Sequence, residues 1–299
     1  MTDRYVVIGN PITHSKSPMI HADFARQLGV DLQYAKLLSP LNGFEQTVKM
    51  LTAAGVKGAN VTVPFKQEAW RLAEQPSAAV VFAQAANTLR FSPDGLQADN
   101  TDGIGLCTDL DRLLQQQGKH LKGSKVVMIG AGGAASGCVS AFKDAGVVEL
   151  IVLNRTLDKA VELAQRAQGI GLKAQGMSLS FLPSDVCTSG LDAQGQVVLV
   201  NASSSSLAGQ AAPISNEWFK SACLTYDMMY GLEPTPFMKQ ALNTKPESPV
   251  SDGLGMLVFQ AAAAFQFWTG LQPNAADTLE RMRHTLQMKS EDRKSTRLN

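Results

Sequence analysis

Short apolar runs alternate with amphipathic segments along most of the chain, and this alternation predicts an α/β fold. The runs that predict buried strands lie at residues 5–8, 33–38, 58–63, 126–129, 197–200 and 224–227. The segments whose pattern or flanking signals predict helices lie at residues 18–28, 43–54, 104–117, 157–167 and 252–268. Strands that are separated by helices in this order build a parallel sheet.

The segment between residues 68 and 99 departs from this alternation. Residues 87–91 and 96–99 are extended runs on either side of a Pro-Asp-Gly turn, which predicts a β-hairpin. Residues 68–86 have helical character that is interrupted near Pro76. The first domain is therefore expected to contain a hairpin beside its α/β units.

The most informative segment is the loop that follows the apolar run at residues 126–129. It reads Gly130-Ala131-Gly132-Gly133-Ala134 and leads through a helix into a second apolar run that ends at Asn154. In dinucleotide-binding units the first glycine permits a tight turn, the second lets the backbone approach a pyrophosphate, and a small third residue permits close helix packing. The segment predicts a Rossmann-type domain, against the alternative of a merely structural turn.

Arg155 indicates which dinucleotide this domain binds. An acidic residue about 20 positions after the glycines would bind the ribose 2′-hydroxyl of NAD. The residues found there are Asn154, Arg155 and Thr156. A guanidinium beside an amide and a hydroxyl suits a 2′-phosphate, which needs positive charge and several donors. The sequence therefore predicts NADP, and a solvated arginine after a strand is the alternative.

These patterns divide the 299 residues into four parts. Residues 1–103 form a first α/β domain, and residues 104–251 form the dinucleotide-binding domain. Residues 252–288 form C-terminal helices, and their apolar character suits them to pack on the first domain. Residues 289–299 mix charges without apolar periodicity, so we expect a disordered tail that comes from outside the natural reading frame.

Composition and charge narrow the range of partners. The formal net charge of +1 provides no field that would recruit nucleic acid or an anionic membrane. The first apolar run is too short for a signal peptide and residues 256–268 are too short to span a bilayer, so we expect a cytoplasmic protein. The cysteines lack zinc-ligand spacing, so we expect no metal and four reduced core thiols, at Cys107, Cys138, Cys187 and Cys223.

Two hydroxyl groups precede the predicted helix at residues 18–28. Ser15 and Ser17 lie where unpaired backbone N–H groups and the positive end of the helix dipole favour a carboxylate. Pro18 suits the first helical position, which makes Ser17 the predicted N-cap. Capping and anion binding are compatible, and the sequence leaves both open.

Lys66 and Asp102 are the candidates for acid–base chemistry. Lys66 follows a predicted strand and a rigid Pro64-Phe65, at the end where open α/β sheets bind ligands. Taken alone, Lys66 is most simply a solvated side chain, and Asp102 is most simply the N-cap of the next helix. Beside an anion site and an NADP domain, the two suggest a proton-transfer pair that works with a hydride carrier.

The chain resembles the shikimate dehydrogenases from about Tyr5 to about Gln287. The motifs that carry the resemblance occur in matching order at residues 9–12, 14–18, 60–66, 87–88, 99–103, 130–134, 154–156, 226–228, 230 and 252–256. The resemblance implies an oxidoreductase, monomeric or homodimeric, with a small-molecule substrate. It would reduce 3-dehydroshikimate reversibly to shikimate with NADPH, a step in aromatic amino acid biosynthesis.

The resemblance also implies roles for individual residues. Those implied to bind the substrate are Ser15, Ser17, Thr62, Lys66, Asn87, Asp102, Tyr230 and Gln260. Those implied to bind NADP are Gly130, Ala131, Gly132, Gly133, Ala134, Asn154, Arg155, Thr156, Lys159, Met228 and Gly253. Lys66 would stabilise and protonate the substrate oxygen, and Asp102 would hold Lys66 in place.

Three positions depart from the family pattern. Gln84 stands where a glycine usually precedes the Ala-x-Asn-Thr motif, and Ser206 replaces a glycine in the loop after Asn201. Ala135 and Ser136 follow the glycine-rich loop without a nearby arginine. Two rival functions stay open: a quinate/shikimate dehydrogenase that uses NAD or NADP, and a noncatalytic NADP-binding sensor on the same scaffold.

Overall fold

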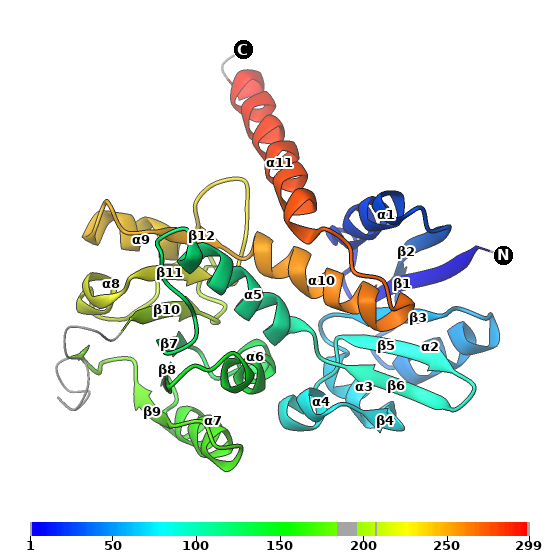
Figure 1. Cartoon of the computed structure of the whole chain (residues 1–299), viewed down its shortest axis with the longest axis horizontal. Coiled ribbons are helices and arrows are strands. Elements are labelled where there is room, and N and C mark those ends of the chain that lie inside the picture. The colour runs from blue at the N-terminus through cyan, green and yellow to red at the C-terminus, as the bar shows by residue number, and fades with distance from the viewer. Residues whose placement is uncertain (1, 184–195, 207, 298–299) are drawn as a thin grey trace. The chain divides into compact units, whose positions relative to one another are not determined.

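The computed structural model describes residues 2–183, 196–206 and 208–297 (Figure 1). The chain divides into two compact units. The first consists of Met1–Gly105 and Leu257–Arg281, and the second of Leu106–Met256 and Met282–Asn299. The chain passes from one unit to the other within three helices, which are α5 (Asp102–Gln115), α10 (Leu254–Thr269) and α11 (Ala275–Arg297).

The first unit contains a mixed six-stranded sheet with the order β2-β1-β3-β5-β6-β4. Its strands are β1 (Asp3–Gly9), β2 (Leu32–Leu38), β3 (Gly58–Val61), β4 (Gln75–Pro76), β5 (Thr88–Ser92) and β6 (Gly95–Asp99). The strands β1, β2 and β3 run parallel, whereas β5 is antiparallel to both β3 and β6. The predicted hairpin is confirmed as β5 and β6.

The helices of the first unit begin close to where the sequence predicts them, with one exception. They are α1 (Ser17–Leu28), α2 (Phe44–Ala53), α3 (Lys66–Leu72) and α4 (Ala78–Ala83). Residues 68–86 form parts of two short helices with β4 between them, so the break near Pro76 is a short strand. Because β4 lies at the edge of the sheet, the missing N–H of Pro76 is tolerated there.

The helix α10 packs on the sheet of the first unit through Trp268. The indole stacks on Tyr5 with ring centroids 4.7 Å apart, and its Nε1 donates a 2.9 Å hydrogen bond to the carbonyl of Leu89. A Cβ atom at Gly58 would lie 2.5 Å from this Nε1. Glycine at position 58 is what allows the indole to approach the strand so closely.

The second unit contains a six-stranded sheet in which all strands are parallel, with the order β12-β11-β10-β7-β8-β9. Its strands are β7 (Lys125–Ile129), β8 (Glu149–Asn154), β9 (Ala174–Ser178), β10 (Val197–Asn201), β11 (Leu224–Asp227) and β12 (Val250–Asp252). From the central pair β7 and β10, the sheet continues through β8 and β9 on one side and through β11 and β12 on the other, as in the Rossmann fold. The predicted Rossmann-type domain is confirmed.

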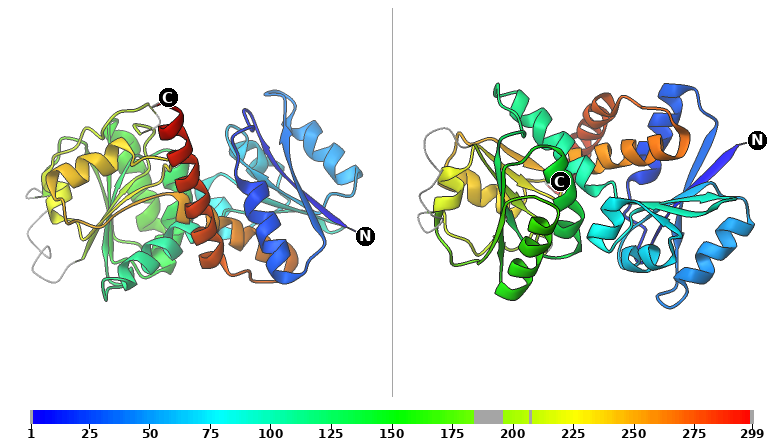
Figure 2. Two further views of the ribbon diagram at one scale, coloured as in Figure 1. Left: turned by 90° about the horizontal axis from the view of Figure 1, so that it is seen from above. Right: turned by 60° about the horizontal axis from the view of Figure 1, so that its bottom comes forward.

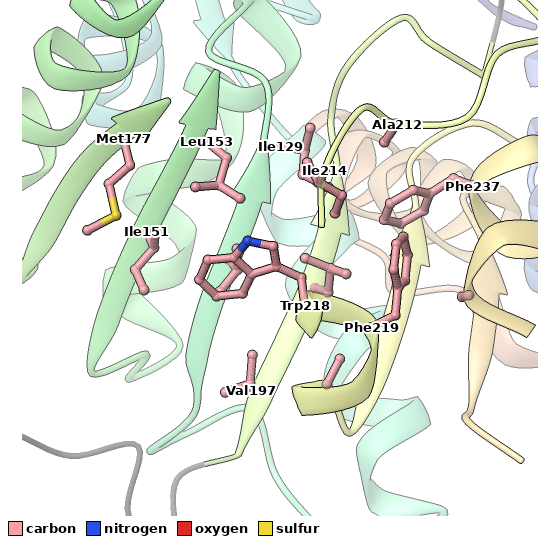
Figure 3. Close-up of a cluster of buried hydrophobic side chains, with 14 residues drawn as sticks. Ile129, Ile151, Leu153, Met177, Val197, Ala212, Ile214, Trp218, Phe219 and Phe237 are labelled. Carbon is pink, nitrogen blue, oxygen red and sulfur yellow. The ribbon is translucent and has the colours of Figure 1, made fainter. Parts of the chain in front are cut away.

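Helices cover both faces of this sheet (Figures 1 and 2). The helices α6 (Gly133–Asp144) and α7 (Leu157–Gly169) lie on one face, and α8 (Glu217–Ser221) and α9 (Pro236–Thr244) lie on the other. Figure 3 shows the core under α8 and α9, where Trp218, Phe219 and Phe237 pack over the strands. This core holds the central strands in place, and those strands carry the glycine-rich loop.

The C-terminal helix extends further than the sequence predicts. The helix α11 continues to Arg297, whereas the sequence predicts a disordered tail from residue 289. Lysine, glutamate and arginine are strong helix formers, and they make up much of residues 289–297. Charge without apolar periodicity is compatible with a helix that continues from a packed one.

The remaining expectations concern cysteines, membranes and metals. Cys107 is free and buried, Cys138 is buried, Cys223 is free and partly buried, and Cys187 lies outside the described residues. Within the described ranges, helices long and apolar enough to cross a membrane are absent. The same residues contain no cluster of His, Cys, Asp and Glu that could hold a metal ion.

Candidate active site

Lys66 and Asp102 form an ion pair in the first unit. Lys66 is the first residue of α3, after the turn that follows β3, and Asp102 is the first residue of α5, after β6. The Lys66 Nζ atom lies 2.5 Å from Asp102 Oδ2, and the two side chains are 27% and 11% exposed. The partial burial shields the pair from solvent while leaving the ammonium accessible.

Asn87 holds the second oxygen of Asp102. Its Nδ2 donates to Asp102 Oδ1 at 2.8 Å and to Thr101 Oγ1 at 3.0 Å, and its Oδ1 accepts from the Thr101 N–H at 2.9 Å. Asn87 is only 3% exposed. Both oxygens of Asp102 are therefore engaged, one by a cation and one by a buried amide.

Gln260 of α10 joins the same cluster from a distant part of the sequence. Its Oε1 accepts from Asn87 Nδ2 and from Thr101 Oγ1, each at 3.3 Å, while its Nε2 donates to the carbonyl of Leu257 at 2.9 Å. The cluster thus combines a cation, a carboxylate and two carboxamides within the first unit. Such a set can bind a polyhydroxylated ligand and move a proton.

The start of α1 corrects one prediction about Ser17. The N-cap is Lys16, which makes no side-chain capping bond, and Ser17 is the first helical residue. Ser15 supplies the capping contact instead, because its Oγ accepts from the Ser17 N–H at 3.3 Å and lies 3.2 Å from Ser17 Oγ. The two hydroxyls are adjacent at the positive end of a 12-residue helix, as an anion site requires.

Thr62 lies in the turn after β3 and packs against the end of β1. Its backbone N–H donates to the Ile8 carbonyl at 2.9 Å, and its Cγ2 would lie 2.5 Å from a Cβ at Gly9. Glycine at position 9 therefore leaves room for the Thr62 side chain. Tyr230 follows β11 in the second unit, where burial raises its pKa.

A cavity of about 610 Å³ lies at the carboxyl ends of the central strands of the second unit. Its lining includes every predicted cofactor residue except Met228 and Gly253, namely Gly130, Ala131, Gly132, Gly133, Ala134, Asn154, Arg155, Thr156 and Lys159. The volume lies within the usual range for a ligand site. Gly253 allows close backbone packing instead, since a Cβ there would lie 2.0 Å from the Met228 carbonyl oxygen.

The glycines of this loop suit a bound pyrophosphate. Gly130 has φ +106°, and a Cβ there would lie 3.1 Å from the backbone of Ala202 and Ser203. Gly132 and Gly133 have open space on the side where a Cβ would be. The helix α6 begins at Gly133 with no side-chain cap, so its first N–H groups can donate to phosphate oxygens.

The sequence reading missed one side of this cavity. Residues 202–205, which follow β10, also line it. The signal was present as a small polar run directly after a predicted strand, at the strand end where such sheets bind ligands. The two residues that follow the glycine-rich loop in place of an arginine, Ala135 and Ser136, are both buried in α6.

Two of the departures from the family pattern have visible structural roles. Gln84 ends α4 with φ +54°, in the left-handed region that favours glycine. The Ser206 hydroxyl donates a 2.6 Å hydrogen bond to Asp227 Oδ2, and Asp227 is fully buried. A glycine at position 206 could not make that bond.

Three family models match separate parts of the chain. Residues 7–89 match the shikimate dehydrogenase substrate binding domain, and residues 112–209 match shikimate / quinate 5-dehydrogenase. Residues 253–287 match the shikimate 5′-dehydrogenase C-terminal domain. Together the matches extend over most of the sequence and both structural units.

Known proteins are similar to the chain over nearly its whole length. The shikimate dehydrogenase (NADP(+)) of Bordetella avium is 44% identical over 288 residues, which cover 95% of this chain and 96% of the relative. The crystal structure of an Ael1 enzyme from Pseudomonas putida has a TM-score of 0.82 at 36% identity, covering 94% of this chain and 98% of the other. Shikimate 5-dehydrogenase from Thermus thermophilus, in complex with NADP(H) and shikimate, has a TM-score of 0.76 at 30% identity and covers 95% and 99%.

Proposed function

This chain belongs to the shikimate dehydrogenase family, and we propose that it catalyses the reversible, NADPH-dependent reduction of 3-dehydroshikimate to shikimate. The relatives named for this reaction match both structural units at once. The reaction serves the biosynthesis of aromatic amino acids. The protein is accordingly an NADP-linked oxidoreductase that acts on a secondary alcohol and the corresponding ketone.

The observation that carries this proposal is the ion pair of Lys66 and Asp102. Reduction of a ketone places negative charge on its oxygen, and an adjacent ammonium stabilises that charge and can donate a proton to it. Lys66 has this role. Asp102 orients Lys66, because its Oδ2 lies 2.5 Å from the Lys66 Nζ atom.

The other polar groups of the first unit bind the substrate. The adjacent hydroxyls of Ser15 and Ser17 hold its carboxylate at the start of α1. Thr62, Asn87 and Gln260 hydrogen-bond its hydroxyl groups and its carbonyl. We also propose Tyr230 as a substrate-binding residue.

The cavity of the second unit would hold NADP. The bound cofactor supplies or accepts the two electrons and the hydrogen that interconvert ketone and alcohol. The loop at residues 130–134 and the start of α6 bind its pyrophosphate. Asn154, Arg155, Thr156 and Lys159 bind the 2′-phosphate, since Arg155 and Lys159 both line the cavity and none of the described lining residues is acidic. Met228 and Gly253 would bind the cofactor at its nicotinamide end.

The direct test is the formation of NADPH from NADP+ and shikimate, followed by absorbance. We expect turnover by the unmodified protein and a loss of roughly 100-fold or more in Lys66→Ala, the range for removal of a general acid or base. Lys49→Ala is the matched control, because Lys49 is exposed on α2 and pairs only with Glu45 among the contacts described for it. Normal turnover in a folded Lys66→Ala protein would exclude Lys66 from the mechanism.

The same assay separates the rival functions. A quinate/shikimate dehydrogenase would turn over quinate as well and would accept NAD, whereas we expect a preference for shikimate and NADP. A noncatalytic sensor would bind NADP without oxidising either substrate. The four combinations of substrate and cofactor therefore distinguish the three functions.

We further propose that the protein works in the cytoplasm as a monomer or homodimer. The free, buried thiol of Cys107 supports a reducing compartment. Light scattering on the purified protein at several concentrations measures the oligomeric state. A larger assembly at all concentrations would contradict this part of the proposal.

A further inference from the structure

A chain of hydrogen bonds, part-buried at Tyr34 and buried from Asn60 onward, connects the phenol of Tyr34 with the ion pair at Lys66. Tyr34, on β2, donates from its hydroxyl to Asn60 Oδ1 at 2.7 Å. Asn60 Nδ2 donates to Thr88 Oγ1 at 3.2 Å, and Thr88 Oγ1 donates to Asn87 Oδ1 at 2.9 Å. Asn87 in turn holds Asp102. All of these residues belong to the first unit.

The amide of Asn60 has one orientation that satisfies this chain. Its Oδ1 accepts from Tyr34, while its Nδ2 donates to Thr88 Oγ1 and to the Asn87 carbonyl, each at 3.2 Å. Asn60 is 7% exposed, so water has little access to replace a lost partner. Without the Tyr34 hydroxyl, the amide oxygen would lose its donor and the reversed orientation would cost less.

The ring of Tyr34 is held by aromatic contacts that do not need its hydroxyl. It stacks on His21 with centroids 4.3 Å apart and planes 6° apart, and it lies 6.3 Å from the ring of Trp268. Burial raises the pKa of Tyr34, and a hydrogen bond from the Ser17 side chain acts in the opposite direction. The phenol hydroxyl donates to Asn60 of β3, and the ring contacts hold it there.

We propose that Tyr34 is a positioning residue for the reaction, and that it acts through Asn60 to fix the side chains that hold substrate and Asp102. This inference rests on the proposed function and extends it to a residue outside the proposed substrate and cofactor sets. Tyr34 orients the amide of Asn60, and Asn60 in turn contacts Thr88 and the Asn87 carbonyl. Its hydroxyl, and not its ring, carries the effect.

The test compares Tyr34→Phe with Tyr5→Phe in the full chain. Tyr5 is the matched control, because it stacks on the same Trp268 and its hydroxyl makes no hydrogen bond with any residue that the structure describes. Loss of one buried hydrogen bond corresponds to about a 5- to 20-fold lower kcat/KM for shikimate in Tyr34→Phe. We expect Tyr5→Phe to stay within about twofold of the unmodified protein, and the KM for NADP+ to be unchanged in both.

A double-mutant cycle with Asn60→Ala tests the route of the effect. If Tyr34 acts through Asn60, then Tyr34→Phe lowers kcat/KM little further once Asn60 is alanine. Additive losses, equal losses in the two tyrosine variants, or an unchanged Tyr34→Phe protein would each overturn the inference. Absence of shikimate oxidation by the unmodified protein would instead refute the proposed function, so the two failures are distinguishable.

Discussion

The hydroxyl of Ser206 donates a 2.6 Å hydrogen bond to Oδ2 of Asp227, and Asn201 donates to Oδ1 of the same carboxylate at 3.1 Å. Asn201 also accepts from the N–H and the hydroxyl of Ser203. The carboxylate therefore ties the end of β11 to the loop after β10, and Ser203 in that loop lines the cofactor cavity.

Replacement of Ser206 by alanine should weaken NADP binding. The change leaves one oxygen of a buried carboxylate without its donor, so we expect a loss of about 1 kcal/mol in the free energy of unfolding. A looser loop should lower the affinity for NADP roughly threefold to tenfold, because binding must then order it. Titration calorimetry with NADP+ and thermal unfolding measure the two effects. Ser221→Ala, an exposed position at the end of α8 and outside the cavity lining, is the control, and equal effects there would refute the role of the Asp227 contact.

Replacement of Asp102 by asparagine should lower turnover more than substrate affinity. The variant keeps an oxygen that can accept from Asn87, but Lys66 loses its ionic partner. We expect kcat to fall about 10- to 100-fold, in the range of acid–base contributions, while the KM for shikimate changes less. Steady-state kinetics with shikimate measure kcat and KM for the variant and the unmodified protein. A large rise in KM at unchanged kcat would show that Asp102 only binds substrate.

The strands of the second unit were predictable because most of them are buried on both faces, which produces continuous apolar runs. The strand β9 was missed because its sequence, Ala-Gln-Gly-Met-Ser, lacks β-branched residues. Gly176 in this strand allows α7 to pack closely on it, since a Cβ there would lie 2.3 Å from the backbone of α7. Tertiary packing, which no local pattern reports, determines that strand.

The candidate site likewise has one part that the sequence predicts and one part that only the fold assembles. The glycine-rich loop is local in sequence, so the nucleotide cavity around it could be predicted from residue spacing. The contacts of Asn87 with Asp102 and Gln260 span 15 and 173 positions, and only the fold brings them together. Their roles came from the family resemblance. Ser17 was misplaced by one position as an N-cap because a serine before a proline looks the same whether it caps the helix or begins it.

Replacement of Gln84 by glycine should stabilise the protein. Gln84 has φ +54°, where a side chain costs about 1 kcal/mol, and its N–H closes α4 on the Val80 carbonyl at 2.8 Å. The gain is partly offset because glycine is more flexible in the unfolded chain, which leaves about 0.5 kcal/mol. Denaturant unfolding of Gln84→Gly and of the control Gln84→Ala measures it. An equal gain in the alanine variant would contradict the backbone explanation.

Replacement of Arg155 by alanine should reduce the preference for NADP over NAD. Arg155 is exposed on the cavity wall beside Thr156, where it can reach a 2′-phosphate. We expect the KM for NADP+ to rise roughly tenfold and the KM for NAD+ to change little, because only NADP carries that phosphate. Lys143→Ala removes a positive charge near the other end of α6 and serves as the control. A parallel rise for both cofactors would place Arg155 elsewhere on the dinucleotide.

The acid stability of the first unit should depend on Asp23, which docks α11 on α1. Asp23 Oδ2 accepts from Thr278 and from Arg281, each at 2.6 Å. Burial acts to raise the pKa of Asp23, but hydrogen bonds from Arg281, Thr278 and others outweigh it and hold the pKa well below the ordinary 3.8. A depressed carboxyl pKa adds stability above the unfolded value, and this stability is lost as the pH falls below 3.8 towards the folded pKa.

We therefore expect Asp23→Asn to destabilise the protein by roughly 1–2 kcal/mol near neutral pH and to flatten the decline of stability in acid. The reason is that the unmodified carboxylate must be protonated before its contacts are lost, whereas asparagine has no charge to lose. Urea unfolding at a series of pH values measures both effects. Asp277→Asn, an exposed position in the first turn of α11, should leave the pH dependence as it is. Parallel stability curves for the unmodified protein and Asp23→Asn would show that this carboxylate is not the group responsible.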